Sequence, residues 1–214
     1  MSQPATLIVW GANSAIAQAV AQLFVARDWR VVGVAHHHTT PISPYDSLWS
    51  CDLSDAAMVD STALQIAQQY GTESDAMLFA AGRMHASKIR DTSAALWHRI
   101  IADNVTTAHL TTTASLALLK TDATMMYLSA YSANIQLPNI GAYAASKAAL
   151  EAYLTVLGKE ERHKRIIAYR MGAVDTPLWH DAPFKLPRGA YAPADMAAKI
   201  LGHFDGGARG AVDC

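Results

Sequence analysis

Cysteine and charged residues are both scarce in this chain of 214 residues. Its two cysteines, Cys51 and Cys214, are too few for a disulfide framework, and neither has partner ligands at metal-binding spacing. Charged residues make up 16%, the formal net charge is -1, and Lys and Arg form no run or stripe. The sequence therefore gives no sign of a surface for nucleic acid.

Long apolar runs are also absent from the sequence. No stretch reaches the roughly 18 to 20 residues that a bilayer-spanning helix needs, and the first ten residues lack the pattern of a signal peptide. We therefore expect a cytoplasmic protein without a membrane partner. Hydrophobic residues make up 51%, and the length allows a sizeable core, so we expect residues 1–214 to form a single domain.

Short apolar runs alternate with segments of helical length and periodicity. We expect strands at Thr6–Trp10, Arg30–Ala35, Ser47–Cys51, Ala76–Ala81, Thr124–Ser129 and Ile166–Met171. We expect helices at Ser14–Arg27, Ala56–Gln69, Ala142–Arg162 and Pro193–Phe204, and one or two helices over Ser93–Leu119. This alternation implies crossover connections and a mostly parallel sheet flanked by helices. The predicted fold is α/β, a Rossmann-type doubly wound domain with ligands beyond the carboxyl ends of its strands.

Two segments carry candidate chemistry. Gly11 to Ala17 joins the first strand to the first helix, where backbone N–H groups and the positive helix end could meet a pyrophosphate, although an ordinary turn explains the glycine equally well. Tyr143 and Lys147 are four residues apart and share one helix face. A cation so close should lower the pKa of the phenol and suit it to proton exchange, and the alternative is an amphipathic helix with a surface lysine.

Together these features resemble the short-chain dehydrogenase/reductase family from about Thr6 to Pro177. The matches follow the order of the family's motifs along the chain. In the first half, the glycine turn corresponds to TGxxxGxG, Asp52-Leu53 to the adenine-contacting pair, and Ala80-Ala81-Gly82 to the end of NNAG. In the second half, Asn104 corresponds to the helix asparagine, Tyr143 and Lys147 to YxxxK, and Met171 to Pro177 to PG-x-x-x-T. Alanines replace two glycines of the turn. Phe79, Ala80 and Met171 also differ from the residues that the family has at these positions, so the resemblance is to a divergent member.

The resemblance implies hydride transfer between a nicotinamide and a small carbonyl or alcohol substrate. Tyr143 would exchange the proton, Lys147 would bind the nicotinamide ribose and keep the phenol acidic, and Asn104 would hold a water that connects Lys147 to solvent. The residues implied to bind the cofactor are Gly11, Asn13, Ser14, Ala15, Ile16, His36, Asp52, Leu53, Ala80, Ala81, Gly82, Asn104, Tyr143, Lys147, Gly172, Val174 and Thr176.

The family's catalytic serine is replaced. It normally lies thirteen residues before the tyrosine, and that position is Ala130 here. Ser129 and Ser132 flank it, and we favour Ser129 as the catalytic serine because it ends the expected strand. If neither reaches the substrate, the oxyanion loses a hydrogen bond whose removal costs on the order of 3 kcal/mol in comparable sites.

Cofactor choice is expected at the end of the second strand. An acidic residue there would bind the ribose of NAD, but this chain has His36-His37-His38, which favours NADP and leaves NAD possible. Adjacent side chains on an extended segment point to alternate faces, so we expect no metal site at these histidines.

The substrate and the assembly are poorly specified by the sequence. Leu178, Trp179, Phe184 and Leu186 form an apolar wall for substrate or pack against the last helix. The family likeness implies a homodimer or homotetramer built on the helices around Asn104 and Tyr143, whose leucines would equally suit a core.

Two rival functions stay open: a nucleotide-binding regulatory protein without catalysis, and a lyase or epimerase that uses the same tyrosine.

Overall fold

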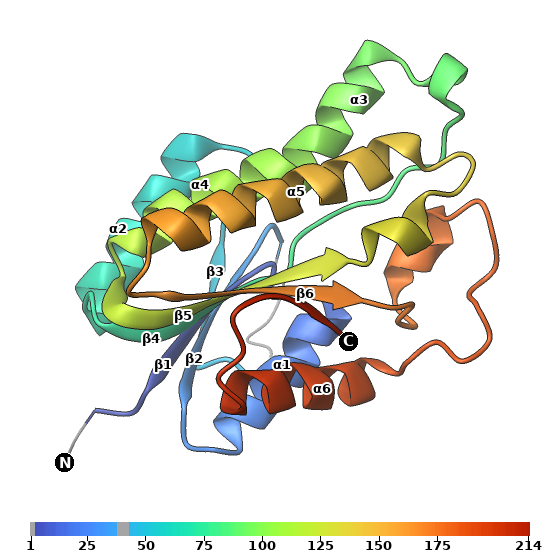
Figure 1. The fold of residues 1–214 in the computed structure, drawn as a ribbon. Coiled ribbons are helices and arrows are strands. Elements are labelled where there is room, and N and C mark those ends of the chain that lie inside the picture. Colours follow the sequence, from blue (N-terminus) through green and yellow to red (C-terminus); the bar gives the residue numbers. More distant parts are fainter. Residues whose placement is uncertain (1–2, 38–42) are drawn as a thin grey trace.

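One parallel sheet organises the chain. The computed structural model describes residues 3–37 and 43–214, and in them seven strands follow the order β3-β2-β1-β4-β5-β6-β7 (Figure 1). The strands are β1 (Thr6–Trp10), β2 (Arg30–Ala35), β3 (Ser47–Ser50), β4 (Ser74–Phe79), β5 (Leu119–Ala130), β6 (Arg165–Met171) and β7 (Gly210–Asp213). The order reverses between β1 and β4, which places a crevice at the carboxyl ends of these strands.

Helices cover both faces of the sheet and close two hydrophobic cores. One face carries α2 (Ala56–Tyr70), α4 (Thr107–Leu116) and α5 (Gly141–Glu160), and the other carries α1 (Ala15–Val25) and α6 (Pro193–Asp205). The inner strands β1 and β4 are almost wholly buried, as their continuous apolar runs predict for a sheet covered on both sides. The predicted fold class is confirmed.

Several predicted boundaries are wrong. β4 ends at Phe79, two residues early, so Ala80 and Ala81 belong to the loop at the crevice. The one or two helices expected over Ser93–Leu119 are three segments: α3 (Ala94–Ile101), a π-helical turn (Ala102–Thr106) and α4. β7 was not expected, because an exposed four-residue edge strand has too little hydrophobic periodicity to be recognised.

The leucines considered for an oligomer interface mostly face the core. Leu150, Leu154 and Leu157 of α5 are buried against the sheet, with Leu110 and Leu116 packed beside them. Leu118 and Leu119 lie outside the helix, and Leu119 begins β5. These side chains therefore stabilise the fold. Within the described residues, no helix is both long and apolar enough to cross a membrane.

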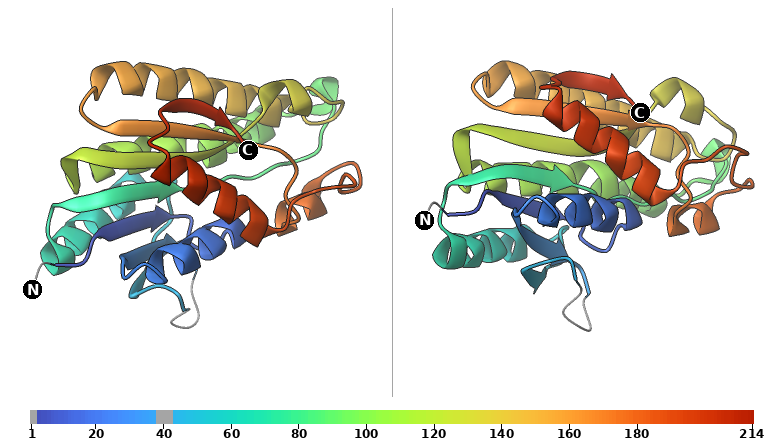
Figure 2. Two further views of the ribbon diagram at one scale, coloured as in Figure 1. Left: turned by 60° about the horizontal axis from the view of Figure 1, so that its bottom comes forward. Right: turned by 90° about the horizontal axis from the view of Figure 1, so that it is seen from below.

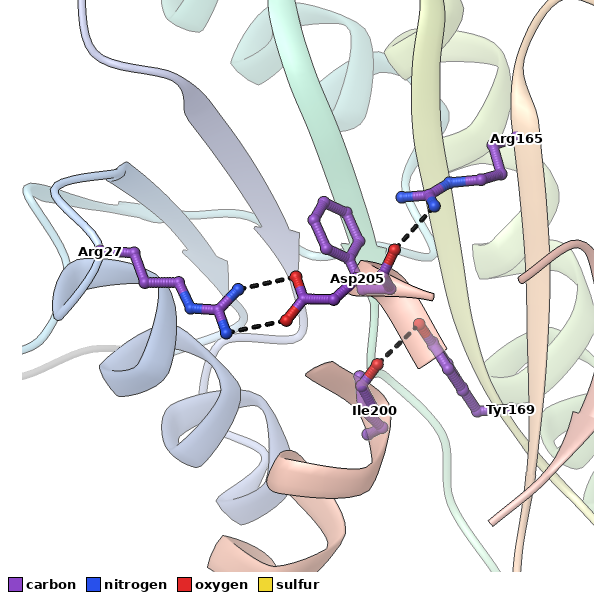
Figure 3. A network of polar contacts seen from close by, with 6 residues as sticks. Arg27, Arg165, Tyr169, Ile200 and Asp205 are labelled. Atoms are coloured by element: carbon purple, nitrogen blue, oxygen red, sulfur yellow. Dashed lines mark hydrogen bonds and ion pairs between the residues drawn. The ribbon is translucent and has the colours of Figure 1, made fainter. Parts of the chain in front are cut away.

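The C-terminal helix is fixed to the sheet and to α1. Figure 2 shows α1 and α6 next to one another on one face. Arg27 donates two hydrogen bonds to the Asp205 carboxylate at 2.7 and 2.8 Å, and Arg165 on β6 donates to the Phe204 carbonyl at 2.7 Å (Figure 3). The ion pair is about half exposed, so it contributes little to stability, and the Phe24 and Phe204 rings beneath it account for more of the attachment.

A buried hydrogen bond between layers allows a test of the packing. Trp10 Nε1 on β1 donates to Ser115 Oγ on α4 at 2.8 Å, and both residues are fully buried. Ser115→Ala should lower the free energy of unfolding by about 1–3 kcal/mol, because it leaves the indole N–H without a partner. Urea unfolding measures the change. Thr113→Ala on the exposed face of α4 is the matched control. Equal stability of the two variants would contradict a stabilising hydrogen bond between Trp10 and Ser115.

Candidate active site

Three adjoining cavities follow the carboxyl edge of the sheet. Their volumes are about 690, 280 and 420 Å³, and each shares lining residues with the next. The largest, called here the adenosine-side cavity, is lined by Gly11, Asn13, Ser14, His36, Asp52, Leu53, Ala80, Ala81 and Gly82 among others. The middle cavity adds Ala15, Ile16, Asn104, Ser129, Tyr143, Lys147 and Thr176, and the third, called the apolar cavity, adds Gly172 and Val174. Every residue predicted for the site therefore lies along one groove.

The glycine turn packs tightly against the loop after β4. Gly11 has a φ of 91°, and a Cβ there would lie 2.6 Å from the Ala81 backbone nitrogen, so the position requires glycine. Ser14 caps α1 by accepting a hydrogen bond from the Ala17 N–H at 3.5 Å. The first turn of α1 thus opens toward the groove, where its N–H groups can meet an anion.

The π-helical turn brings Asn104 to the groove. Its Nδ2 donates to the Arg83 and Ile100 carbonyls at 2.8 and 2.9 Å, while its buried Oδ1 has no partner within the described structure. A Cβ on Gly82 would lie 2.7 Å from that oxygen and 3.5 Å from Lys147 Nζ. Asn104 Oδ1 and Lys147 Nζ therefore border the same space beside Gly82, and a water or ligand hydroxyl there would satisfy the unpaired oxygen.

Tyr143 and Lys147 share one face of α5, but the phenol is not acidic. Lys147 Nζ lies 5.7 Å from the centre of the Tyr143 ring and donates to the Leu128 carbonyl at 3.3 Å. Burial raises the pKa of Tyr143 to about 12, and burial lowers the pKa of Lys147 to about 8, against a smaller upward effect of Glu151. The predicted lowering of the Tyr143 pKa is wrong here, because burial alone accounts for the shift and the Lys147 ammonium adds no opposing effect at this separation.

Ser129 is the serine that the structure places in the groove. It is 1% exposed and lines both the middle and the apolar cavities with Tyr143. Its Oγ donates to Glu151 Oε1 at 3.4 Å, a contact that the sequence analysis did not anticipate. Ala130 lines the apolar cavity and offers no hydroxyl, and the side chain of Ser132 lies outside the described part of the structure.

A carboxylate from the loop after β3 lies beside the end of β2. Asp52 Oδ2 lies 3.5 Å from His36 Nε2, so the chain has an acidic group beside the predicted phosphate site even though β2 does not end in one. Hydrogen bonds from Ser54, and secondarily His36, lower the pKa of Asp52. In the described residues, no three His, Cys, Asp or Glu side chains gather to hold a metal ion, and His38 lies outside them.

Sequence reasoning missed a row of polar residues, two of them charged, on the helical segments around Asn104. Arg99, Asp103 and Thr107 line the adenosine-side cavity with Arg83. Their four-residue spacing indicates a shared helix face and could have identified them. The two arginines add positive charge where an anionic cofactor would lie.

The apolar cavity has the character of a substrate site. Leu178, Trp179 and Phe184 line it as expected, whereas Leu186 does not. Trp179 Nε1 donates to the Val174 carbonyl at 2.8 Å, and its ring meets Phe184 edge to face at 5.9 Å. The irregular segment after β6 therefore supplies one wall, and Tyr143 stands where this cavity joins the middle one.

A sequence model of the family described as enoyl-(acyl carrier protein) reductase matches residues 11–193. The chain belongs to the short-chain dehydrogenase/reductase family. An uncharacterised oxidoreductase of Saccharomyces cerevisiae is 34% identical over 89 residues, which are 42% of this chain and 33% of that protein. The match spans only about a third of that relative's length.

Solved structures of short-chain dehydrogenases share the fold. Aldohexose dehydrogenase of Thermoplasma acidophilum superposes with a TM-score of 0.86 at 21% identity, covering 99% of this chain and 93% of that one. An alcohol dehydrogenase of Thermococcus sibiricus, complexed with 5-hydroxy-NADP, gives 0.86 at 20% identity, with 99% and 96% covered. At these identities the likeness concerns the fold alone.

The groove fits the nicotinamide cofactor that the family implies. Gly82 is a position where a side chain would enter the space bordered by Asn104 and Lys147, and the unpaired Asn104 oxygen lies at the same place. In the turn after β1 the N–H groups of Gly11, Ala12 and Ser14 are paired within the protein, whereas no hydrogen bond among the described residues uses the Ala15 and Ile16 N–H groups at the start of α1, which a pyrophosphate could meet. The residues of the short-chain dehydrogenase pattern are thus arranged for a dinucleotide along the groove.

The buried ammonium of Lys147 should cost stability. At pH 7, Lys147→Met should raise the free energy of unfolding of the cofactor-free protein by about 1–3 kcal/mol, because burial disfavours the charge. The folded-state pKa of about 8 lies below the ordinary 10.5, so the parent gains stability from this group as pH rises between those values. Urea unfolding should therefore show that the difference in unfolding free energy between Lys147→Met and the parent becomes smaller as pH rises from about 8 to 10.5.

Lys159→Met on the exposed part of α5 is the control for that measurement. A Lys147→Met protein less stable than its parent at pH 7 would contradict the expected cost.

Proposed function

We propose that this chain is an NADP-dependent oxidoreductase that acts on a carbonyl or alcohol group of a small, largely apolar molecule, with Tyr143 as the general acid/base. One observation carries the proposal: Tyr143 lines both the middle and the apolar cavities, next to the buried Lys147. A proton donor at that junction is within reach of both a cofactor and a substrate. Membership of the family supports an oxidoreductase. The choice of NADP, the kind of substrate and the role of Tyr143 are proposed from the residues of the site.

The residues of the site suit carbonyl reduction. The bound cofactor supplies the hydride. Because burial keeps the Tyr143 phenol protonated to about pH 12, it can donate its proton to the developing alkoxide, and Lys147 stabilises the phenolate that remains. A water between Asn104 Oδ1 and Lys147 Nζ would then connect the pair to solvent. In the oxidative direction Tyr143 would have to lose its proton first, which its raised pKa disfavours.

The preference for NADP rests on charge. His36, Arg83 and Arg99 line the adenosine-side cavity, and His36 weakens the repulsion between Asp52 and a 2′-phosphate by pairing with that carboxylate. The cofactor-containing relative from Thermococcus sibiricus holds an NADP derivative, which agrees with this choice. NAD remains the alternative that Asp52 favours.

A second function is favoured by Ala130. A nucleotide-binding regulatory protein could keep the groove while lacking the hydroxyl that polarises a substrate carbonyl. Cofactor binding without turnover on a broad carbonyl panel would support it, and activity restored by Ala130→Ser would count against a purely regulatory fold. The lyase or epimerase reading, the homo-oligomer and the cytoplasmic location stay predictions from the sequence.

Removing the Tyr143 hydroxyl tests the proposed chemistry. Tyr143→Phe should lower kcat for carbonyl reduction by about 10²–10⁴-fold, the usual contribution of a general acid, and leave NADPH affinity nearly unchanged. Nicotinamide absorbance measures turnover, and fluorescence titration measures binding. Tyr153→Phe on the same helix is the control, and full activity in Tyr143→Phe would refute the assignment.

Charge reversal at His36 tests the cofactor. His36→Asp should weaken NADPH binding by about tenfold, or ~1.4 kcal/mol, because two carboxylates would then face the 2′-phosphate, while NADH binding should improve or stay the same. Fluorescence titration of both cofactors gives the ratio. His163→Asp, an exposed histidine before β6, should leave the ratio unchanged. If the ratio of NADPH affinity to NADH affinity is unaltered in His36→Asp, the 2′-phosphate of NADPH does not bind beside His36.

A further inference from the structure

Glu151 lies behind the proposed catalytic residues and has no role in the proposed reaction. It is four residues after Lys147 and eight after Tyr143, so all three belong to one face of α5. Its Oε1 accepts the hydrogen bond from Ser129 Oγ at 3.4 Å. Ser129 is almost fully buried, and its side chain reaches from β5 toward α5. Glu151 thus contacts the serine that lines both the middle and the apolar cavities with Tyr143.

Charged groups from three elements surround the Glu151 carboxylate. Lys147 on α5 and Arg170 on β6 attract it, Asp213 on β7 repels it, and Ser129 on β5 donates to it. Arg170 Nε forms an ion pair with Asp213 Oδ1 at 2.7 Å, so part of its charge is directed away from Glu151. Burial is the largest effect and raises the pKa of Glu151, which brings its protonation nearer to the working range of an enzyme.

A serine hydroxyl has only one proton to donate. While Glu151 is ionised, that proton is directed to the carboxylate, and only the lone pairs of Ser129 Oγ remain for the groove. Those lone pairs can accept a hydrogen bond from a phenol but cannot stabilise a negative oxygen. Ala130 cannot supply the missing donor. The protonation state of Glu151 therefore decides whether a serine can polarise a substrate carbonyl.

We propose that Glu151 is a positioning residue that sets the direction of the Ser129 hydroxyl: ionised, it turns the proton away from the substrate oxygen, and uncharged, it leaves that proton free to donate to it. This inference rests on the proposed reductase function. It accounts for a partly buried carboxylate in contact with Ser129, and it makes carbonyl reduction faster at lower pH. The hydrogen-bond network shifts without any movement of the backbone.

Glu151→Gln imitates the uncharged state at every pH. The amide can donate to Ser129 Oγ, so the serine proton becomes available to the substrate. At neutral pH, kcat for carbonyl reduction should rise by about tenfold, short of the full value of one oxyanion donor, with little change in KM. The rise of the parent's rate toward acid pH should be absent from the variant's profile.

Two controls separate this effect from a general loss or gain of packing. Glu160→Gln, exposed at the end of the same helix, should behave as the parent. In a Ser129→Ala background, Glu151→Gln should have no effect on kcat, because the proton that it releases is missing. A Glu151→Gln enzyme as fast as the parent or slower, or an equal gain in the Ser129→Ala background, would overturn the proposal.

A measurement that needs no turnover completes the test. The carboxyl stretch of Glu151, isolated as the infrared difference between parent and Glu151→Gln proteins, reports its protonation as pH is varied. Ser129→Ala should raise the pKa of Glu151, because the serine bond stabilises the carboxylate. An unchanged pKa would overturn the contact itself. If the parent protein fails to turn over any carbonyl substrate, the proposed function fails, while this titration still decides whether Glu151 holds Ser129.

Discussion

The burial of an ammonium and a phenol on one face of α5 is the constraint on which the site depends. Lys147 and Tyr143 are 5% and 7% exposed, and both charged forms are disfavoured by their surroundings. In the described structure, the carbonyl of Leu128 is the only hydrogen-bond partner of the ammonium. An apolar side chain at this position would avoid the cost of burying the ammonium, so Lys147 lowers the stability of the fold, as expected for a residue with a role in the proposed reaction.

The topology of the sheet explains why the groove lies there. The chain leaves β1 for one side of the sheet and returns at β4 on the other, so the loops after these strands diverge and leave a crevice. The tight approach of Gly11 to Ala81 closes the floor of that crevice. On its far side, β5 and α5 hold Ser129, Tyr143 and Lys147 from two rigid elements, which fixes the geometry that proton transfer requires.

The fold could be predicted from local signals, and the residues of the groove from motifs whose order resembles that of the short-chain dehydrogenase/reductase family. Continuous apolar strands, helix-length spacers and the position of Tyr143 four residues before Lys147 are all visible in the sequence. The electrostatics could not be predicted in the same way. The pairing of Asp52 with His36, the burial that raises the pKa of Tyr143 and the contact of Ser129 with Glu151 each join separate elements, so they depend on packing that no spacing encodes.

The π-helical turn at Ala102–Thr106 has a consequence for how this chain tolerates insertions and deletions. Each residue in an α-helix advances the chain by about 100° around the axis, and a π turn accommodates one additional residue at such a point. Because the additional residue is absorbed locally, loss of a single residue there would restore regular winding while α3 and α4 kept the faces that they now present. Asn104 lies inside this turn, so such a deletion would move its amide away from the space beside Lys147, whereas the buried threonines of α4 would keep their packing.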